Sequence, residues 1–168
     1  VPPVANTASA GTATIGATLE LVTAITIANT SALDFGRIAI TGGGPVAGVH
    51  VLSSAGVVAT QAGSSAMVGG AGTPGSFDIT GGVTAGNVTA AVSAAVSYDG
   101  GDILVDQLIF GGPGLSAPVT VAAGATGTLV FGGGSTDVQV GGRITFSGTP
   151  AVGAYNGLDF TVTITDIP

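Results

Sequence analysis

Residues 12–22 read Thr-Ala-Thr-Ile-Gly-Ala-Thr-Leu-Glu-Leu-Val, in which apolar side chains alternate with small or polar ones. A period of two residues places the two sets on opposite faces of a β-strand. The apolar face of this predicted strand comprises Ala13, Ile15, Ala17, Leu19 and Leu21. The stretch therefore predicts a half-buried strand, and the same pattern recurs along the rest of the chain.

Composition extends the all-β prediction to the whole chain of 168 residues. Among the larger aliphatic side chains Val and Ile outnumber Leu, and β-branched residues fit a pleated sheet better than a helix. The 31 glycines and 8 prolines interrupt most of the apolar runs, which disfavours long helices. We expect an antiparallel β-sandwich of immunoglobulin-like or jelly-roll type, with less than about 10% helix.

The apolar runs between turn signals predict about ten to twelve short strands. Besides the first, they cover residues 25–27, 33–40, 46–52, 56–59, 76–80, 88–98, 103–110, 119–122, 127–131, 137–140, 143–147 and 158–165. Asp-Gly sequences adopt the positive φ values of tight turns, so Asp99-Gly100-Gly101-Asp102 and Asn156-Gly157 are expected to be turns. Residues 61–76, rich in Gly, Ser and Ala, are expected to form a loop.

The apolar phase of each strand predicts the core of the domain. It comprises Ile25, Ile27, Leu33, Phe35, Phe77, Ile79, Ile144, Phe146, Phe160, Val162 and Ile164. If Phe35 and Phe160 are core residues, replacing either with Ala should cost about 3–5 kcal/mol.

The chain divides into an N-terminal extension, residues 1–16, and a single sandwich domain, residues 17–168. The extension is small and polar, and Val1-Pro2-Pro3-Val4-Ala5 looks like a mature terminus left by removal of a signal peptide. We therefore expect a secreted protein at the bacterial cell surface.

Charge is scarce in this sequence. Lys is absent, Arg37 and Arg143 are the only two Lys or Arg residues, and the formal net charge is −7. A surface without a basic patch disfavours nucleic acid and anionic lipid as partners. No apolar stretch is long enough to insert into a membrane. Solubility must come from Ser, Thr and Asn or from covalent glycans, for which Asn29 and Asn87 are candidate acceptors.

No set of residues supplies a nucleophile, a base and an orienting group together, so we expect neither a catalytic site nor a cofactor. Cys is absent and His50 is the only histidine. Asp34-Phe35-Gly36 matches a kinase triplet by letters alone, and without lysine the kinase reading fails. Asp99, Asp102 and Asp106 are a weak calcium candidate, and turn formation accounts better for their spacing.

The N-terminal segment is predicted to be a donor strand that completes the sandwich of a neighbouring subunit. Its expected contacts are Val4, Ala13, Ile15, Ala17 and Leu19, from the apolar phase of the first stretch. About 15 extended residues reach roughly 50 Å, which is enough to enter the next domain. The alternative is that residues 13–21 form the first strand of their own sandwich, with residues 1–12 as a tail.

Four short motifs carry a resemblance to a known family. They are Leu33-Asp34-Phe35-Gly36-Arg37-Ile38, Ser76-Phe77-Asp78-Ile79-Thr80-Gly81, Val140-Gly141-Gly142-Arg143-Ile144-Thr145-Phe146 and residues 153–164. Their order and spacing resemble the bacterial secreted family catalogued as domain of unknown function 4402. The resemblance implies a β-sandwich exported by Gram-negative bacteria, with no known catalytic residues and with some members similar to fibre subunits.

Together these features predict a structural subunit of an extracellular, pilus-like filament, a homopolymer assembled head to tail by donor-strand exchange. The alternative is a monomeric secreted binding module, such as an adhesin or a carbohydrate binder. Carbohydrate sites use exposed aromatic rings, and only Tyr98 and Tyr155 are candidates for that role.

Overall fold

A computed structural model describes residues 25–40, 47–63, 65–68, 72–80, 86–132, 135–155 and 159–167. Within these ranges every strand pairing is antiparallel. The helical content of the same ranges is one 3-10 turn, Asp99–Gly101. The predicted all-β antiparallel sandwich is therefore confirmed.

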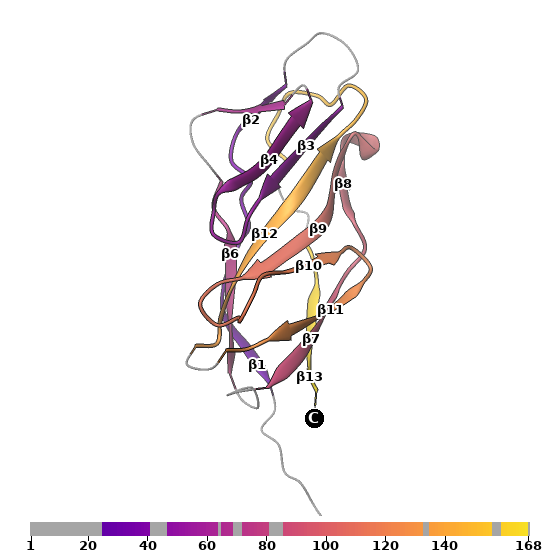
Figure 1. The fold of residues 1–168 in the computed structure, drawn as a ribbon. Helices are drawn as coiled ribbons and strands as arrows, with labels where there is room; N and C mark the ends of the chain where they lie inside the picture. The colour runs from indigo at the N-terminus through magenta and orange to yellow at the C-terminus, as the bar shows by residue number, and fades with distance from the viewer. Residues whose placement is uncertain are drawn as a thin grey trace, which may run out of the picture.

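The main sheet has eight strands, and β12 lies at its centre (Figure 1). Its members are β1 (Thr26–Ser31), β3 (Gly48–Leu52), β4 (Val58–Gly63), β6 (Gly75–Thr80), β8 (Val96–Tyr98), β9 (Ile103–Gly111), β10 (Val119–Ala122) and β12 (Asp137–Phe146). One edge of β12 pairs with β9. Its other edge pairs first with β6 and then with β3, so β12 joins three strands that are distant in sequence.

A second sheet of three strands covers only part of the main sheet. It consists of β7 (Asn87–Val92), β11 (Thr126–Val130) and β13 (Val162–Ile167), in the order β11-β7-β13. In Figure 1 this sheet lies at the end of the molecule where β1 begins and β13 finishes. At the opposite end, β2 (Ile38–Ile40) and β5 (Ser65–Met67) form a separate two-stranded sheet.

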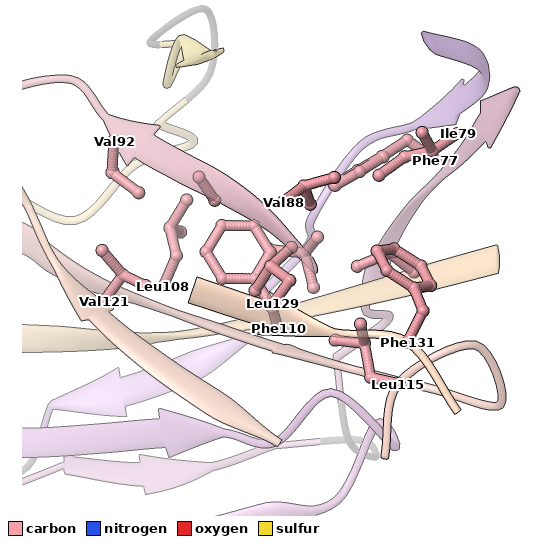
Figure 2. Close-up of a cluster of buried hydrophobic side chains, with 13 residues drawn as sticks. Phe77, Ile79, Val88, Val92, Leu108, Phe110, Leu115, Val121, Leu129 and Phe131 are labelled. Carbon is pink, nitrogen blue, oxygen red and sulfur yellow. The ribbon is translucent and has the colours of Figure 1, made fainter. Parts of the chain in front are cut away.

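Two clusters of buried side chains follow from this unequal coverage. The larger one, the Phe110 cluster, lies between the two main layers (Figure 2). It comprises Phe77, Ile79, Val88, Ala90, Val92, Leu108, Phe110, Leu115, Val121, Leu129, Phe131, Val138 and Val140. The smaller one, the Ile144 cluster, comprises Ile103, Val105, Ile144 and Phe146. The Ile144 cluster is covered by individual, partly buried side chains and not by a continuous second sheet. These side chains are Phe35, Ile38, Tyr98, Tyr155 and Phe160.

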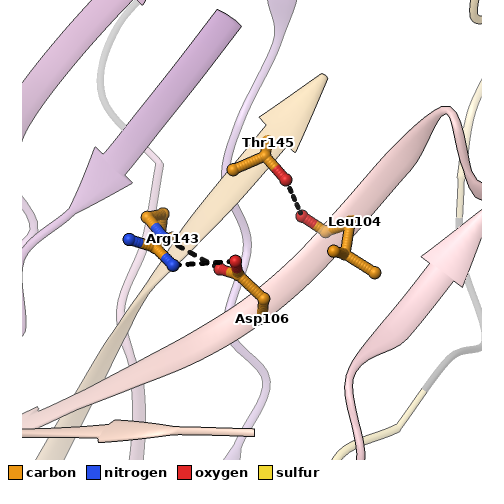
Figure 3. A network of polar contacts seen from close by, with 4 residues as sticks. All are labelled: Leu104, Asp106, Arg143 and Thr145. Atoms are coloured by element: carbon orange, nitrogen blue, oxygen red, sulfur yellow. Dashed lines mark hydrogen bonds and ion pairs between the residues drawn. The ribbon is translucent and has the colours of Figure 1, made fainter. Parts of the chain in front are cut away.

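A β-bulge at Asp106 separates the two clusters. Arg143 pairs with Gln107 and Ile144 with Val105, which leaves Asp106 as the extra residue of β9. The bulge reverses the inward phase of β9, because Ile103 and Val105 are buried before it and Leu108 and Phe110 after it. Both oxygens of the Asp106 carboxylate accept hydrogen bonds of 2.8 Å from Arg143 (Figure 3).

Several predicted strand boundaries were wrong for local reasons. Residues 33–40 were expected to be one strand, but the Gly36 amide donates to the Asp34 carboxylate at 2.8 Å and Gly36 has a φ of 75°. This Asx-type turn leaves only Ile38–Ile40 as a strand. The predicted strand 88–98 is two strands in different sheets, and the predicted loop 61–76 contains β5 and the end of β4.

The hairpin turn at residues 99–102 is confirmed between β8 and β9. The Asn156-Gly157 turn lies outside the described residues.

Candidate functional site

An apolar groove of about 1430 Å³ runs between an edge of the main sheet and an edge of the second sheet. One side is formed by β1 and residues 32–39, and the other by residues 150–155 and 159–162. Among the described strands β1 pairs only with β6, and β13 pairs only with β7. The two outer strands therefore each present one backbone edge without a described neighbour, and the groove lies between them. We call this feature the seam groove.

Side chains along the seam groove have the sequence pattern of a core but are only partly covered. Six predicted core residues are half-buried rather than buried: Ile25, Leu33, Phe35, Phe160, Val162 and Ile164. Ile27 of β1 is 40% exposed, so its prediction as a core residue was wrong. The predictions for Phe77, Ile79, Ile144 and Phe146 are confirmed. Most of the half-buried residues belong to one margin of the groove or the other, where no further described strand covers them.

The floor of the seam groove is formed by β6, β9 and β12. Ile103, Val105, Ile144 and Phe146 of the Ile144 cluster all line it. Leu33 and Phe35 pack directly over Gly142. A Cβ at Gly142 would lie 3.0 Å from the Phe35 ring and 3.2 Å from the Leu33 side chain, so glycine allows this close contact. The floor is therefore apolar and closely packed, while the groove above it is open to a further element.

Residues 32–37 form a shaped wall rather than a strand. Asp34 and Thr73 exchange two backbone hydrogen bonds of 2.7 and 2.8 Å, which anchor the wall to the segment before β6. The turn at Gly36 then directs Phe35 toward the Ile144 cluster, against which it packs. Phe35 was expected to be a core residue, and this prediction holds only in part because its side chain is half-buried.

Tyr98 and Tyr155 lie together at the end of the seam groove near the β8–β9 turn. Their ring centroids are 5.4 Å apart with an interplanar angle of 61°, an edge-to-face contact. The Tyr155 hydroxyl donates to the Ala151 carbonyl and lies 3.4 Å from the Asp99 carboxylate. Partial desolvation, and then the charge of Asp99, raises the pKa of Tyr155. The pair closes this end of the groove.

The three calcium candidates serve different hydrogen bonds. Asp102 accepts from the Thr149 amide at 2.9 Å, and Asp99 accepts from the Ala151 amide at 2.5 Å. These two carboxylates hold the loop before Tyr155 against the β8–β9 turn. Asp106 instead pairs with Arg143. In the described part of the chain, no three His, Cys, Asp or Glu side chains are grouped so that they could hold a metal ion.

The remaining predicted site residues are the donor-strand residues and the two glycan candidates. The donor-strand residues Val4, Ala13, Ile15, Ala17 and Leu19, and the boundary at residue 16, lie outside them. Of the glycan candidates, Asn29 lies within β1 and Asn87 is exposed at the start of β7.

Among the residues that the structure describes, three charged side chains line the seam groove, namely Asp34, Arg37 and Asp159. Arg37 is exposed, and the ion pair found in the described part of the chain belongs instead to Arg143. Hydrogen bonding to Asp106 raises the pKa of Arg143. Sequence reasoning named the predicted donor residues and missed the seam groove. One feature could have indicated the groove. Predicted core residues lie on β1 and β13, and each of these strands has no described partner on one side.

His50 is a buried polar group away from the groove. It lies on β3 opposite Ile144, is fully buried, and neither ring nitrogen has a hydrogen-bond partner among the described residues. Burial lowers the pKa of His50 because the charged form loses its hydration. The neutral ring is thus the form that suits the folded protein.

The fold and the groove define an all-β sandwich with an open seam. The chain belongs to the family described as domain of unknown function (DUF4402), whose model matches residues 25–165. This confirms the resemblance drawn from the four motifs. Comparison with curated proteins and with solved structures gave no match. None of the described residues forms a helix long and apolar enough to cross a membrane.

Proposed function

We propose that the protein is a structural, non-catalytic subunit of an extracellular bacterial filament. In this proposal the N-terminal segment of one subunit fills the seam groove of the next. The observation that carries it is the groove itself, with half-buried apolar margins at two strand edges. A strand added there would gain backbone hydrogen bonds, and its alternate side chains would cover the apolar margins.

The size of the groove also favours a chain segment over a small ligand. Small-molecule pockets occupy about 300–1,000 Å³, and the groove is larger, at about 1430 Å³. The apolar phase of residues 13–21 has the residue types needed to cover its floor. Because the contact joins two different surfaces of the subunit, it propagates as a filament unless the rotation closes a ring.

The test is deletion of Val1–Gly16 from the full chain, followed by electron microscopy. We expect wild-type subunits to form filaments and the truncated protein to stay monomeric. A peptide of residues 1–21 should bind the truncated monomer, whereas the same peptide with Ile15→Asp should bind at least about 10-fold more weakly, because a charge would enter an apolar groove. Filaments of normal appearance from the truncated protein would disprove the proposal.

A second candidate is a secreted binding module, favoured by the Tyr98–Tyr155 pair at the end of the groove. It predicts single particles rather than filaments, and loss of glycan binding in Tyr155→Ala. Electron microscopy of the wild-type protein separates the two candidates directly.

A further inference from the structure

Within the described part of the chain, Arg37 is the one cation that lines the seam groove. The chain has only two Lys or Arg residues, and the other, Arg143, is held by Asp106 through two hydrogen bonds on β12 and β9. The Arg37 side chain is exposed and makes no ion pair with any described residue. In a chain of net charge −7, a cation without a carboxylate at the rim of a docking groove needs an explanation.

The predicted donor segment carries one complementary charge. Within residues 1–24 the only charged side chain is Glu20, which is also the only Glu in the chain. It falls on the polar phase of the stretch, opposite Leu19 and Leu21. When the apolar phase faces the groove floor, Glu20 faces outward, toward the rim, which is where an exposed arginine can meet it.

We propose that Glu20 of one subunit pairs with Arg37 of the next and so fixes the register of the inserted strand. This inference rests on the proposed function, since it takes the N-terminal segment as the occupant. Alternating Ala, Ile and Leu side chains alone specify register weakly, because a slip by two residues keeps the same face inward. A single ion pair discriminates between such registers, because Asp34 and Asp159, the other charged residues of the described lining, would repel Glu20.

The ion pair has a distinctive test, because the two charges belong to different molecules. We expect Arg37→Glu and Glu20→Arg each to slow seeded filament growth about 3- to 10-fold at low ionic strength, by placing like charges together. The double variant should grow at the wild-type rate. An equimolar mixture of the two single variants should also recover, because the reversed donor of E20R then meets the reversed acceptor of R37E in alternation.

Controls separate this effect from folding and from net charge. Ser97→Glu adds a charge at an exposed position that does not line the groove, and it should leave growth unchanged. Circular dichroism of each monomer should be the same as wild type, since Arg37 is exposed. In about 1 M salt, where the Debye length is near 3 Å, the single variants should approach the wild-type rate.

Three outcomes distinguish the possibilities. Single variants that grow like wild type would overturn the ion pair while leaving the filament proposal intact. Recovery in the double variant but not in the mixture would place both charges in the same molecule and overturn the intersubunit pair. Growth of the protein lacking Val1–Gly16 would instead remove the filament proposal on which the pair depends.

Discussion

The two halves of the main sheet differ in how they are covered. On one side of the Asp106 bulge, the second sheet covers the Phe110 cluster of 13 buried residues. On the other side, the Ile144 cluster has four buried residues and is covered by Phe35, Ile38, Tyr98, Tyr155 and Phe160, all partly exposed. Both halves are made from the same alternating sequence pattern. The pattern therefore determines which way a side chain faces, and a second layer determines whether it is buried.

The largest expected effect contrasts one phenylalanine from each setting. Phe110 is fully buried with a ring centroid 6.3 Å from that of Phe77, so Phe110→Ala should destabilise the isolated subunit by about 3–5 kcal/mol. Phe160 is half-buried at the groove margin, so Phe160→Ala should cost only about 1–2 kcal/mol. Urea denaturation of monomers measures both. Equal losses would show that the groove is closed within the monomer.

The next effect concerns the boundary between the halves, where β12 changes partner from β6 to β3. A Cβ on Gly141 would lie 2.1 Å from the Leu52 carbonyl oxygen, which is backbone and cannot rotate away. Gly141→Ala should therefore cost about 1–3 kcal/mol by overpacking. Gly153 is the matched control, since a Cβ there meets nothing within 4 Å, and Gly153→Ala should change stability by less than about 0.5 kcal/mol.

A smaller effect is expected from the ion pair at the bulge. The Arg143 and Asp106 side chains are 40% and 23% exposed, so solvent screens their attraction. A double-mutant cycle with Arg143→Gln and Asp106→Asn should give a coupling of about 1 kcal/mol, which decreases in high salt. A coupling indistinguishable from zero would mean that the backbone alone maintains the bulge.

The smallest effect at neutral pH comes from His50, which lies opposite Ile144 in the β3–β12 pair. Its folded pKa is lowered by burial, so its contribution is complete above the unfolded value of about 6.5 and is lost as the pH falls below it. Wild type should lose stability between about pH 6.5 and pH 5, where few unfolded carboxylates titrate. His50→Leu should flatten that slope. An unchanged slope would assign the acid sensitivity to other groups.

Much of the fold could be predicted from alternation and turn chemistry, because both are local. The β8–β9 turn at Asp99-Gly100 and the facing of Phe77 and Ile144 follow directly from the sequence. The strand breaks at Gly36 because the Asp34 carboxylate accepts a hydrogen bond from the Gly36 amide in place of strand pairing. Neither alternation nor turn chemistry predicts which of these two interactions prevails. The partial exposure of Phe160 was beyond prediction, since it depends on which distant strands lie over the residue rather than on its neighbours in sequence.

The candidate site was predicted from one side only. The alternation at Ala13–Leu21 is visible in the sequence, so the donor segment could be named. The receiving groove combines β1, β9, β12 and β13, which are brought together only by long-range pairing. Asp106 shows the same limit, because its spacing from Asp102 resembled a ligand pattern while its partner, Arg143, comes from a strand 37 residues away.

The central place of β12 has a consequence for the order in which the protein can fold. Three strands made earlier, β3, β6 and β9, take β12 as their common neighbour. Until Asp137–Phe146 has left the ribosome, these strands lack the partner that joins them, so the main sheet has no stable partial form during synthesis. Such non-local pairing folds slowly and leaves apolar strands exposed meanwhile. A nascent chain that ends before β12 should therefore be a substrate for chaperones and proteases rather than a folded intermediate.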